Sequence, residues 1–155
     1  MARAEMSHDG DAPSGRAHQR YPERSELHDD VTRAVLPANR NAPGAARKLL
    51  GFCFAHALGA GALSDAQLLI SELVTNSLVH GELGDGASIV VRMHLHTEAL
   101  RLEVHNRGSA GSIAANGGDP GRSRGHGLDI VRSLGTRWGV LRGMDTCVWV
   151  DAPRT

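Results

Sequence analysis

One segment carries polar residues at a spacing that could do chemistry. In ISELVTNSLVHG, Glu72, Asn76 and His80 follow one another at intervals of four residues. Residues four apart share one face of an α-helix. On such a face the Asn76 amide oxygen could bind Mg²⁺, and Glu72 could act as a base toward an attacking hydroxyl or water. By itself the spacing also fits an ordinary solvated helix face.

A glycine-rich passage, GRSRGHGLDIV, comes before a second segment of helical pattern, and in it Gly125 and Gly127 flank His126. Backbone N–H groups at a helix start carry partial positive charge, and glycine lets a phosphate approach them closely. Arg122 and Arg124 could add charge there. The passage therefore fits a phosphate-binding loop, with a flexible loop that ends in a helix cap as the alternative.

Two helices are predicted in the first half of the chain. Ser64 and the glutamine three residues later form a capping box, which predicts that the helix carrying Glu72 spans residues 64–80. An earlier helix should begin with Pro43 in its first turn, because its apolar residues recur at helical spacing. Gly59 and Gly61 should end this earlier helix.

The remaining patterns predict strands and one further helix. Alternating or β-favouring stretches indicate strands at residues 31–37, 87–95, 99–105, 136–141 and 146–152, and the helical pattern resumes at residues 127–135. The second and third strands should form an antiparallel hairpin across Thr97 and Glu98. This order of elements predicts an α+β fold, a two-layer α/β sandwich with helices on one face of a mostly antiparallel mixed sheet.

Two segments have little apolar content. Residues 1–30 carry 4 arginines against 7 acidic residues and few large apolar side chains, so we predict a disordered tail followed by one domain at residues 31–155. Between the strand that ends near Asn106 and the helix near His126, a long glycine-rich stretch predicts a mobile loop. Loops of this length in compact domains are usually functional or disordered.

Composition excludes several classes of protein. The 17 basic residues balance 17 acidic ones, so there is no general attraction to nucleic acid or to an anionic membrane. Lys48 is the only lysine, which excludes a Walker A loop elsewhere in the chain. Cys53 and Cys147 lie too far apart in sequence for a Cys-x-x-Cys motif, and the first residues lack the apolar core of a signal peptide. We therefore expect a cytoplasmic protein.

The motifs occur together and in a fixed order. ELVTN with a following His-Gly, then HNRG, GHGL, RWGV and VWV resemble the anti-sigma-factor serine/threonine kinase branch of the GHKL ATPases, the histidine kinase-like superfamily, over residues 31–151. The resemblance implies a Bergerat-type fold in which ATP and Mg²⁺ bind between helices and sheet. It also implies a sigma factor or an anti-anti-sigma antagonist as partner, with a homodimer as a further possibility.

The resemblance assigns a role to each matching residue. Glu72 matches the catalytic base, and Asn76 matches the Mg²⁺ ligand. Residues of the later motifs match positions that hold the nucleotide. They are Gly108 in HNRG, and Gly125, His126, Gly127 and Leu128 in GHGL. His80, after ELVTN, matches a frequent position of the first motif, without a chemical role.

Two positions depart from the family pattern. Asn106 stands where relatives carry an aspartate that accepts a hydrogen bond from the adenine amino group, and Cys147 aligns near the base where many relatives have threonine, with Thr146 one position earlier. Asn106 keeps an acceptor oxygen but loses the charge and gains a donor. The change could cost on the order of 1 kcal/mol of binding.

These patterns lead to two functional hypotheses, the second of which has a variant. The first is an ATP-dependent kinase that phosphorylates Ser or Thr of an antagonist protein. The second is a degenerate module that binds its partner and binds nucleotide weakly or not at all. A variant of the second has altered base preference, because the Asn106 amide could donate to the guanine carbonyl oxygen.

Overall fold

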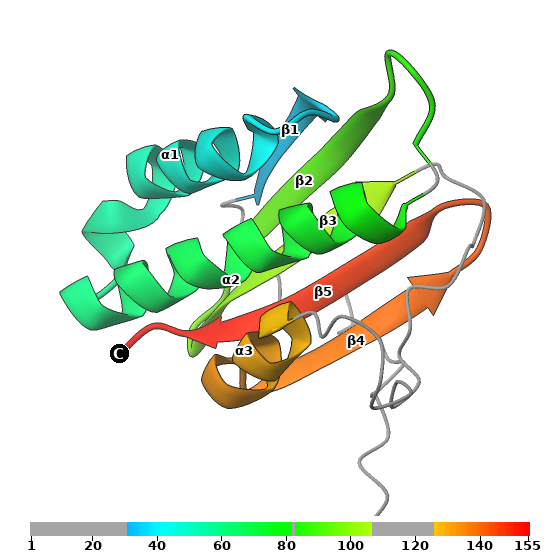
Figure 1. Cartoon of the computed structure of the whole chain (residues 1–155). Coiled ribbons are helices and arrows are strands. Elements are labelled where there is room, and N and C mark those ends of the chain that lie inside the picture. The colour runs from blue at the N-terminus through cyan, green and yellow to red at the C-terminus, as the bar shows by residue number, and fades with distance from the viewer. Residues whose placement is uncertain (1–30, 82, 107–125) are drawn as a thin grey trace, which may run out of the picture.

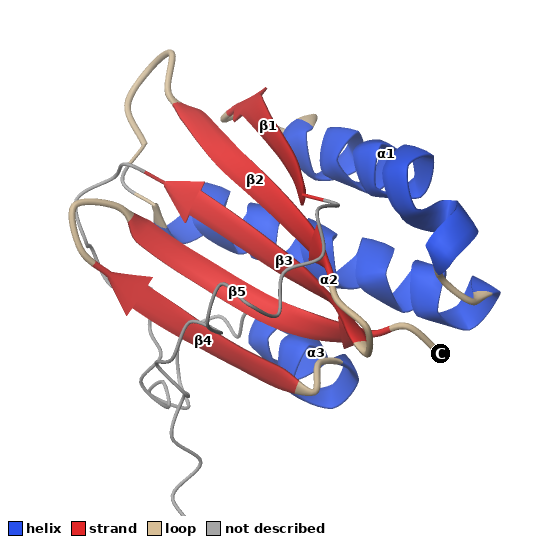
Figure 2. Ribbon diagram, turned by 180° about the vertical axis from the view of Figure 1, so that it is seen from behind, coloured by secondary structure: helices blue, strands red, loops and turns tan. Residues whose placement is uncertain are grey.

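The computed structural model describes residues 31–81, 83–106 and 126–155. In this part of the chain a five-stranded sheet has its helices packed on one face, as Figure 1 shows from the helix side and Figure 2 from the sheet side. The predicted α+β sandwich with helices on one face is confirmed.

The sheet has the strand order β1-β2-β3-β5-β4, and every pair of neighbours among these strands is antiparallel. The strands are β1 (Val31–Pro37), β2 (Ser88–Leu95), β3 (Ala99–Asn106), β4 (Arg137–Arg142) and β5 (Thr146–Pro153). Each lies within one residue of its predicted bounds, because alternating apolar residues mark one face of each strand. The β2–β3 hairpin turns at Thr97 and Glu98, where the His96 amide donates to the Ala99 carbonyl.

Three α-helices lie in the described part of the chain: α1 (Ala42–Phe54), α2 (Ala60–His80) and α3 (His126–Leu134). The prediction that α2 begins at Ser64 is wrong, because the helix begins four residues earlier, after Gly59. Ser64 Oγ donates to the Ala60 carbonyl within the helix, at 3.2 Å. Gln67 Nε2 donates to the Arg47 carbonyl of α1, at 3.3 Å, so this pair does not form a capping box.

The hydrophobic core lies between α2 and the sheet. From α2, the fully buried side chains include Leu69, Ile70, Leu73 and Val74. From the strands, alternate residues on the helix-facing side complete the core: Ile89, Val91, Met93, Leu100, Leu102, Val104, Val148 and Val150. No helix among the described residues has the length and apolarity needed to cross a membrane.

The turn after α3 fixes that helix against the edge of the sheet. The Gly135 amide donates to the Val131 carbonyl at 3.0 Å and closes the helix. A Cβ at Gly135 would lie 2.4 Å from Val150 Cγ2, so only glycine permits this approach to β5. The adjacent Thr136 amide donates to the Asp151 carbonyl at 2.9 Å, which aligns the start of β4 with β5. The end of α3 is therefore held in a defined position relative to β5.

Candidate functional site

Helix α2 carries the two residues predicted to do chemistry. Leu73 and Val74 are fully buried and fix the rotation of the helix about its axis. Glu72 and Asn76, one helical turn apart, consequently fall at the boundary of the buried face, and each is half-buried. His80, in the last turn, is exposed.

The Asn76 amide is partly unsatisfied. Its Nδ2 atom is buried and has no hydrogen-bond partner among the described residues. An unpaired buried polar group costs about 1–3 kcal/mol. Asn76 thus has an N–H donor left for a bound ligand, which fits a ligand with acceptor oxygens such as a phosphate.

Asn106 is the last residue of β3, and its side chain is 3% exposed. Asn106 Nδ2 donates a buried hydrogen bond of 2.8 Å to Ser77 Oγ, and Ser77 directly follows Asn76 on α2. A Cβ at Gly81 would lie 2.8 Å from Asn106 Nδ2, so the glycine after α2 makes room for this amide. The end of β3 and the end of α2 are therefore joined beside Asn76.

The structure places Thr146, rather than Cys147, next to Asn106. Thr146 is buried and pairs directly with Asn106 across β3 and β5. Consecutive strand residues point to opposite faces of a sheet. Cys147 Sγ accordingly lies 3.6 Å from His105 Nε2, and His105 is on the face away from Ser77. The expected position of Cys147 beside the base does not agree with this geometry.

Sequence reasoning did not single out Ser77, and it named Gly81 and Thr146 only as neighbours of motif residues, without a place in the site. One signal was present in the chain, because Thr146 has the same parity as the apolar core residues Val148 and Val150. The hydrogen bond from Asn106 to Ser77 had no such signal, since it joins residues 29 positions apart.

The glycine-rich motif GHGL lies at the start of α3. His126, Gly127 and Leu128 form the first turn of this helix, which packs against α2. Backbone N–H groups of a first turn point away from the helix and suit a negatively charged group. The predictions for Gly108 and Gly125 lie outside the described residues.

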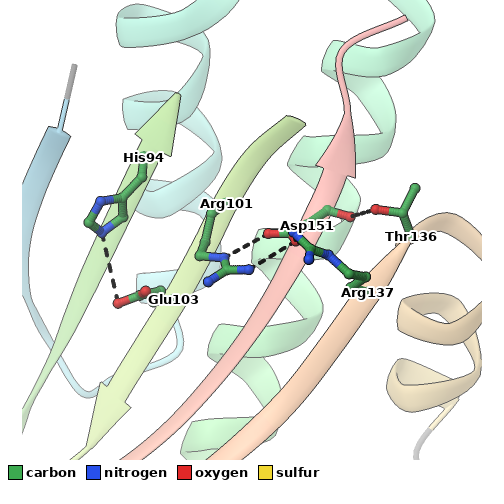
Figure 3. Close-up of polar contacts among 6 residues, drawn as sticks. All are labelled: His94, Arg101, Glu103, Thr136, Arg137 and Asp151. Atoms are coloured by element: carbon green, nitrogen blue, oxygen red, sulfur yellow. Dashed lines mark hydrogen bonds and ion pairs between the residues drawn. The ribbon is translucent and has the colours of Figure 1, made fainter. Parts of the chain in front are cut away.

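The face of the sheet away from the helices carries a buried ion-pair network. Arg101 donates two hydrogen bonds to the Asp151 carboxylate, of 2.7 and 2.9 Å, and Arg137 Nε donates a third of 3.0 Å (Figure 3). The Arg101 guanidinium also lies 4.2 Å from the ring centre of Trp149. A Cβ at Gly139 would lie 2.8 Å from Trp149 Nε1, so glycine provides the space for the indole.

Beside this network, Glu103 is buried between histidines. Burial raises the pKa of Glu103, but the hydrogen bond with His105 and the charges of His94, His105 and Arg101 outweigh it, so its pKa lies below the usual value. Burial lowers the pKa of His94, and the opposing attraction of Glu103 does not reverse this shift. Near neutral pH the carboxylate is therefore charged and the His94 ring is neutral.

Comparison with known proteins identifies the family. The family model for the histidine kinase-like ATPase domain matches residues 35–151, which include α2, α3 and all of β2, β3 and β4. No curated protein matches the sequence. The matched region contains the half-buried pair on α2 and the end of β3 that the geometry brings together. The chain therefore belongs to the histidine kinase-like ATPase family.

Proposed function

We propose that the protein binds Mg-ATP beside α2, the end of β3 and the start of α3, and phosphorylates Ser or Thr of an antagonist protein. Membership of the family implies ATP binding, usually with Mg²⁺. The observation that carries the proposal is the buried, unpartnered amide nitrogen of Asn76, one turn from Glu72 and adjacent to the Asn106–Ser77 contact.

In this proposal Glu72 and Asn76, both on α2, have separate roles. Bound Mg-ATP supplies the phosphoryl group and neutralises part of its charge. Asn76 would hold the metal through its amide oxygen. Glu72 would orient the attacking hydroxyl of the antagonist and accept its proton while the new oxygen–phosphorus bond forms and the bond to the ADP oxygen breaks. Glu72 is half-buried, as a residue at the edge of a site would be.

Asn106 favours adenine over guanine. The nitrogen end of its amide is bonded to Ser77 Oγ, which orients the side chain. The oxygen end is then the end suited to accept a hydrogen bond from the adenine amino group. A neutral acceptor binds more weakly than the carboxylate of relatives, so we expect ATP to bind with reduced affinity and still in preference to GTP.

The partner class follows from the resemblance of the motifs to anti-sigma-factor kinases. In that role the protein binds a sigma factor, and phosphorylation of the antagonist controls which partner is bound. The balanced charge of the chain agrees with a protein partner and gives no general attraction to nucleic acid.

Calorimetric titration tests the nucleotide site. The native protein is titrated with ATP, ADP and GTP, each with and without Mg²⁺, beside Asn76→Ala and Thr75→Ala. Thr75 is the matched control, because it is the neighbouring α2 residue and is exposed. We expect Mg²⁺-dependent ATP binding that Asn76→Ala removes and Thr75→Ala retains. Equal ATP binding by both variants would contradict the assignment.

Phosphotransfer is tested separately with Glu72→Gln. Glu98→Gln is its control, because Glu98 is exposed in the β2–β3 turn. With a candidate antagonist and labelled ATP, we expect Glu72→Gln to bind ATP and to transfer phosphate about 10²–10⁴-fold more slowly, the usual contribution of a general base. A normal rate in Glu72→Gln would exclude Glu72 as the base.

One observation favours a second candidate function, a module that binds its partner without nucleotide control. Asn106 lacks the negative charge of the aspartate that relatives carry at this position, and its amide nitrogen already donates a hydrogen bond to Ser77. If this loss is decisive, the native protein binds no nucleotide and Asn106→Asp does. That result would replace the kinase proposal with a constitutive binding function.

A further inference from the structure

Four side chains that commonly bind metals gather on the face of the sheet away from α2. They come from three neighbouring strands: His94 from β2, Glu103 and His105 from β3, and Cys147 from β5. His105 and Cys147 are directly paired across the strands, and Glu103 lies two residues from His105 on the same face. His94 points toward Glu103 from the other side (Figure 3).

Within this cluster, Glu103, His105 and Cys147 approach the spacing of ligands around one metal ion. Glu103 Oε2 lies 3.0 Å from His105 Nε2, which lies 3.6 Å from Cys147 Sγ, and the three ligand atoms are all within 4.8 Å of one another. A tetrahedral Zn²⁺ ion holds nitrogen and sulfur about 3.6 Å apart, and nitrogen and oxygen about 3.3 Å apart. The two distances from His105 already fit, and rotation of the Glu103 and Cys147 side chains toward each other would complete the group.

The geometry does not suit a nucleophilic Cys–His–Glu triad. In a triad the two imidazole nitrogens face different partners, one the nucleophile and the other the carboxylate. Here the same atom, His105 Nε2, is the one closest to both Cys147 Sγ and Glu103 Oε2. Convergence of three potential ligands on a common point is the arrangement of a metal site.

His94 lies beside this group without being part of it. Both of its ring nitrogens are buried and lack hydrogen-bond partners among the residues that the structure describes. His94 Nε2 lies 3.9 Å from Glu103 Oε2, which is too long for a hydrogen bond. His94 is paired with Arg101, four residues along the sheet from the level of His105 and Cys147, so it does not reach an ion bound there.

The charges balance when a divalent ion is bound. The Glu103 carboxylate and the Cys147 thiolate together cancel the two positive charges of the ion, and the His105 imidazole binds as a neutral ligand. Arg101, the nearby cation, is already paired with Asp151 at 2.7 Å. The loaded site thus carries no net charge, which avoids the desolvation cost of an isolated ion.

We propose that Glu103, His105 and Cys147 form a Zn²⁺ site on the face of the sheet opposite the proposed nucleotide site, with the fourth position of the ion open to water. A thiolate with one imidazole and one carboxylate selects Zn²⁺ over Mg²⁺ and Ca²⁺, which prefer oxygen ligands. On binding, the Cys147 thiol loses its proton to solvent as the Zn–S bond forms. The ion joins β3 and β5, and so stabilises the strands that carry Asn106 and Thr146 on their other face.

The test uses the full chain without a polyhistidine tag, stripped of metal with a chelator. Zn²⁺ is titrated by calorimetry and by competition with a chromogenic chelator, and Co²⁺ is added as a spectroscopic probe. We expect one tightly bound Zn²⁺ per chain, higher thermal stability with Zn²⁺, and a Co²⁺ spectrum with thiolate charge-transfer absorption. Mg²⁺ and Ca²⁺ should not compete.

Matched variants locate the ion. Cys147→Ser and His105→Gln should weaken Zn²⁺ binding by more than the about 10- to 100-fold that loss of an outer-shell partner causes. Cys147→Ser should also remove the thiolate absorption of the Co²⁺ form. The controls Cys53→Ser, on α1, and His56→Gln, which is exposed, should bind as the native protein does.

Several results would overturn the proposal. They are absence of Zn²⁺ binding by the native protein, unchanged binding by Cys147→Ser, or loss of binding in Cys53→Ser or His56→Gln. Circular dichroism of each metal-free variant shows whether it folds. If Cys147→Ser does not fold, the Co²⁺ spectrum of the native protein decides, because a spectrum without thiolate absorption excludes Cys147 as a ligand.

Discussion

The two faces of the central sheet are stabilised in different ways. On the side of the helices, alternate residues of β3 and β5 are apolar and pack against α2, and the polar Asn106 and Thr146 occur only at one end. On the other side, the intervening residues of the same strands include three charged residues that are still buried, Arg101, Glu103 and Asp151. That side depends on specific pairings, such as Arg101 with Asp151, rather than on apolar contact.

This difference shows how one pair of strands can serve two separate sites. His105 and Cys147 are the chain neighbours of Asn106 and Thr146, and the sheet separates each from the next residue. A change confined to one face should therefore leave the chemistry of the other face intact, while a change in strand alignment should affect both. The following predictions test that separation.

The largest effect is expected from Asp151→Ala. It leaves the Arg101 guanidinium buried without its carboxylate, and breaking a buried ion pair costs about 3–5 kcal/mol. Arg137→Ala is the matched control, since its side chain is 62% exposed and its pairing with Asp151 is worth about 0–1 kcal/mol. Urea unfolding measures both, and equal losses of stability would show that burial does not strengthen this network.

A second stability effect is expected from Gly139→Ala. The new Cβ would lie 2.8 Å from Trp149 Nε1 and displace the indole from beneath Arg101. Such overpacking typically costs about 1–3 kcal/mol. Gly143→Ala is the control, because its Cβ would meet no atom closer than 3.9 Å. Thermal unfolding with tryptophan fluorescence measures the difference, and an unperturbed Gly139→Ala protein would mean that the indole moves without cost.

Sequence patterns predicted the architecture because each strand has a two-residue period that marks its apolar face. They failed at the start of α2, where Ser64 bonds to a carbonyl within the helix rather than capping it. A serine followed three residues later by a glutamine looks the same in the sequence whether it caps a helix or lies inside one. Only the position of α1, whose Arg47 carbonyl accepts a hydrogen bond from Gln67, distinguishes the two cases.

The placement of Glu72 and Asn76 on one side of a helix was predictable, because it depends on a four-residue spacing within a single element. The candidate site was less predictable where it depends on the alignment of strands. The contact of Asn106 with Ser77 and the cluster around Glu103 each join segments that are distant in the chain. Cys147 was assigned to the base by its position in a motif, whereas alternation with Val148 and Val150 assigns that face to Thr146.

On the helix face, Asn106→Asp should strengthen ATP binding by up to about tenfold, near 1 kcal/mol, because a carboxylate accepts a stronger hydrogen bond from the adenine amino group. The Ser77 hydroxyl accepts from Asn106 Nδ2 at present and can rotate to donate to the aspartate. Calorimetry with ATP measures the gain. In the Ser77→Ala background the gain should shrink, and a full gain there would show that Ser77 does not orient the side chain.

The smallest effect compares two adjacent residues of β5. Thr146→Val should weaken ATP binding by about 0.5–1.5 kcal/mol, the value of one hydrogen bond, because Thr146 pairs with Asn106 on the helix face. Cys147→Ala, measured in metal-free protein, should leave ATP affinity within about twofold, since Cys147 contacts His105 on the other face. The reverse order, with Cys147→Ala the more damaging, would mean that the strand presents Cys147 to the nucleotide after all. When Zn²⁺ affinity is measured instead, the order should reverse. Cys147→Ala should weaken Zn²⁺ binding, because it removes the thiolate ligand, and Thr146→Val should not.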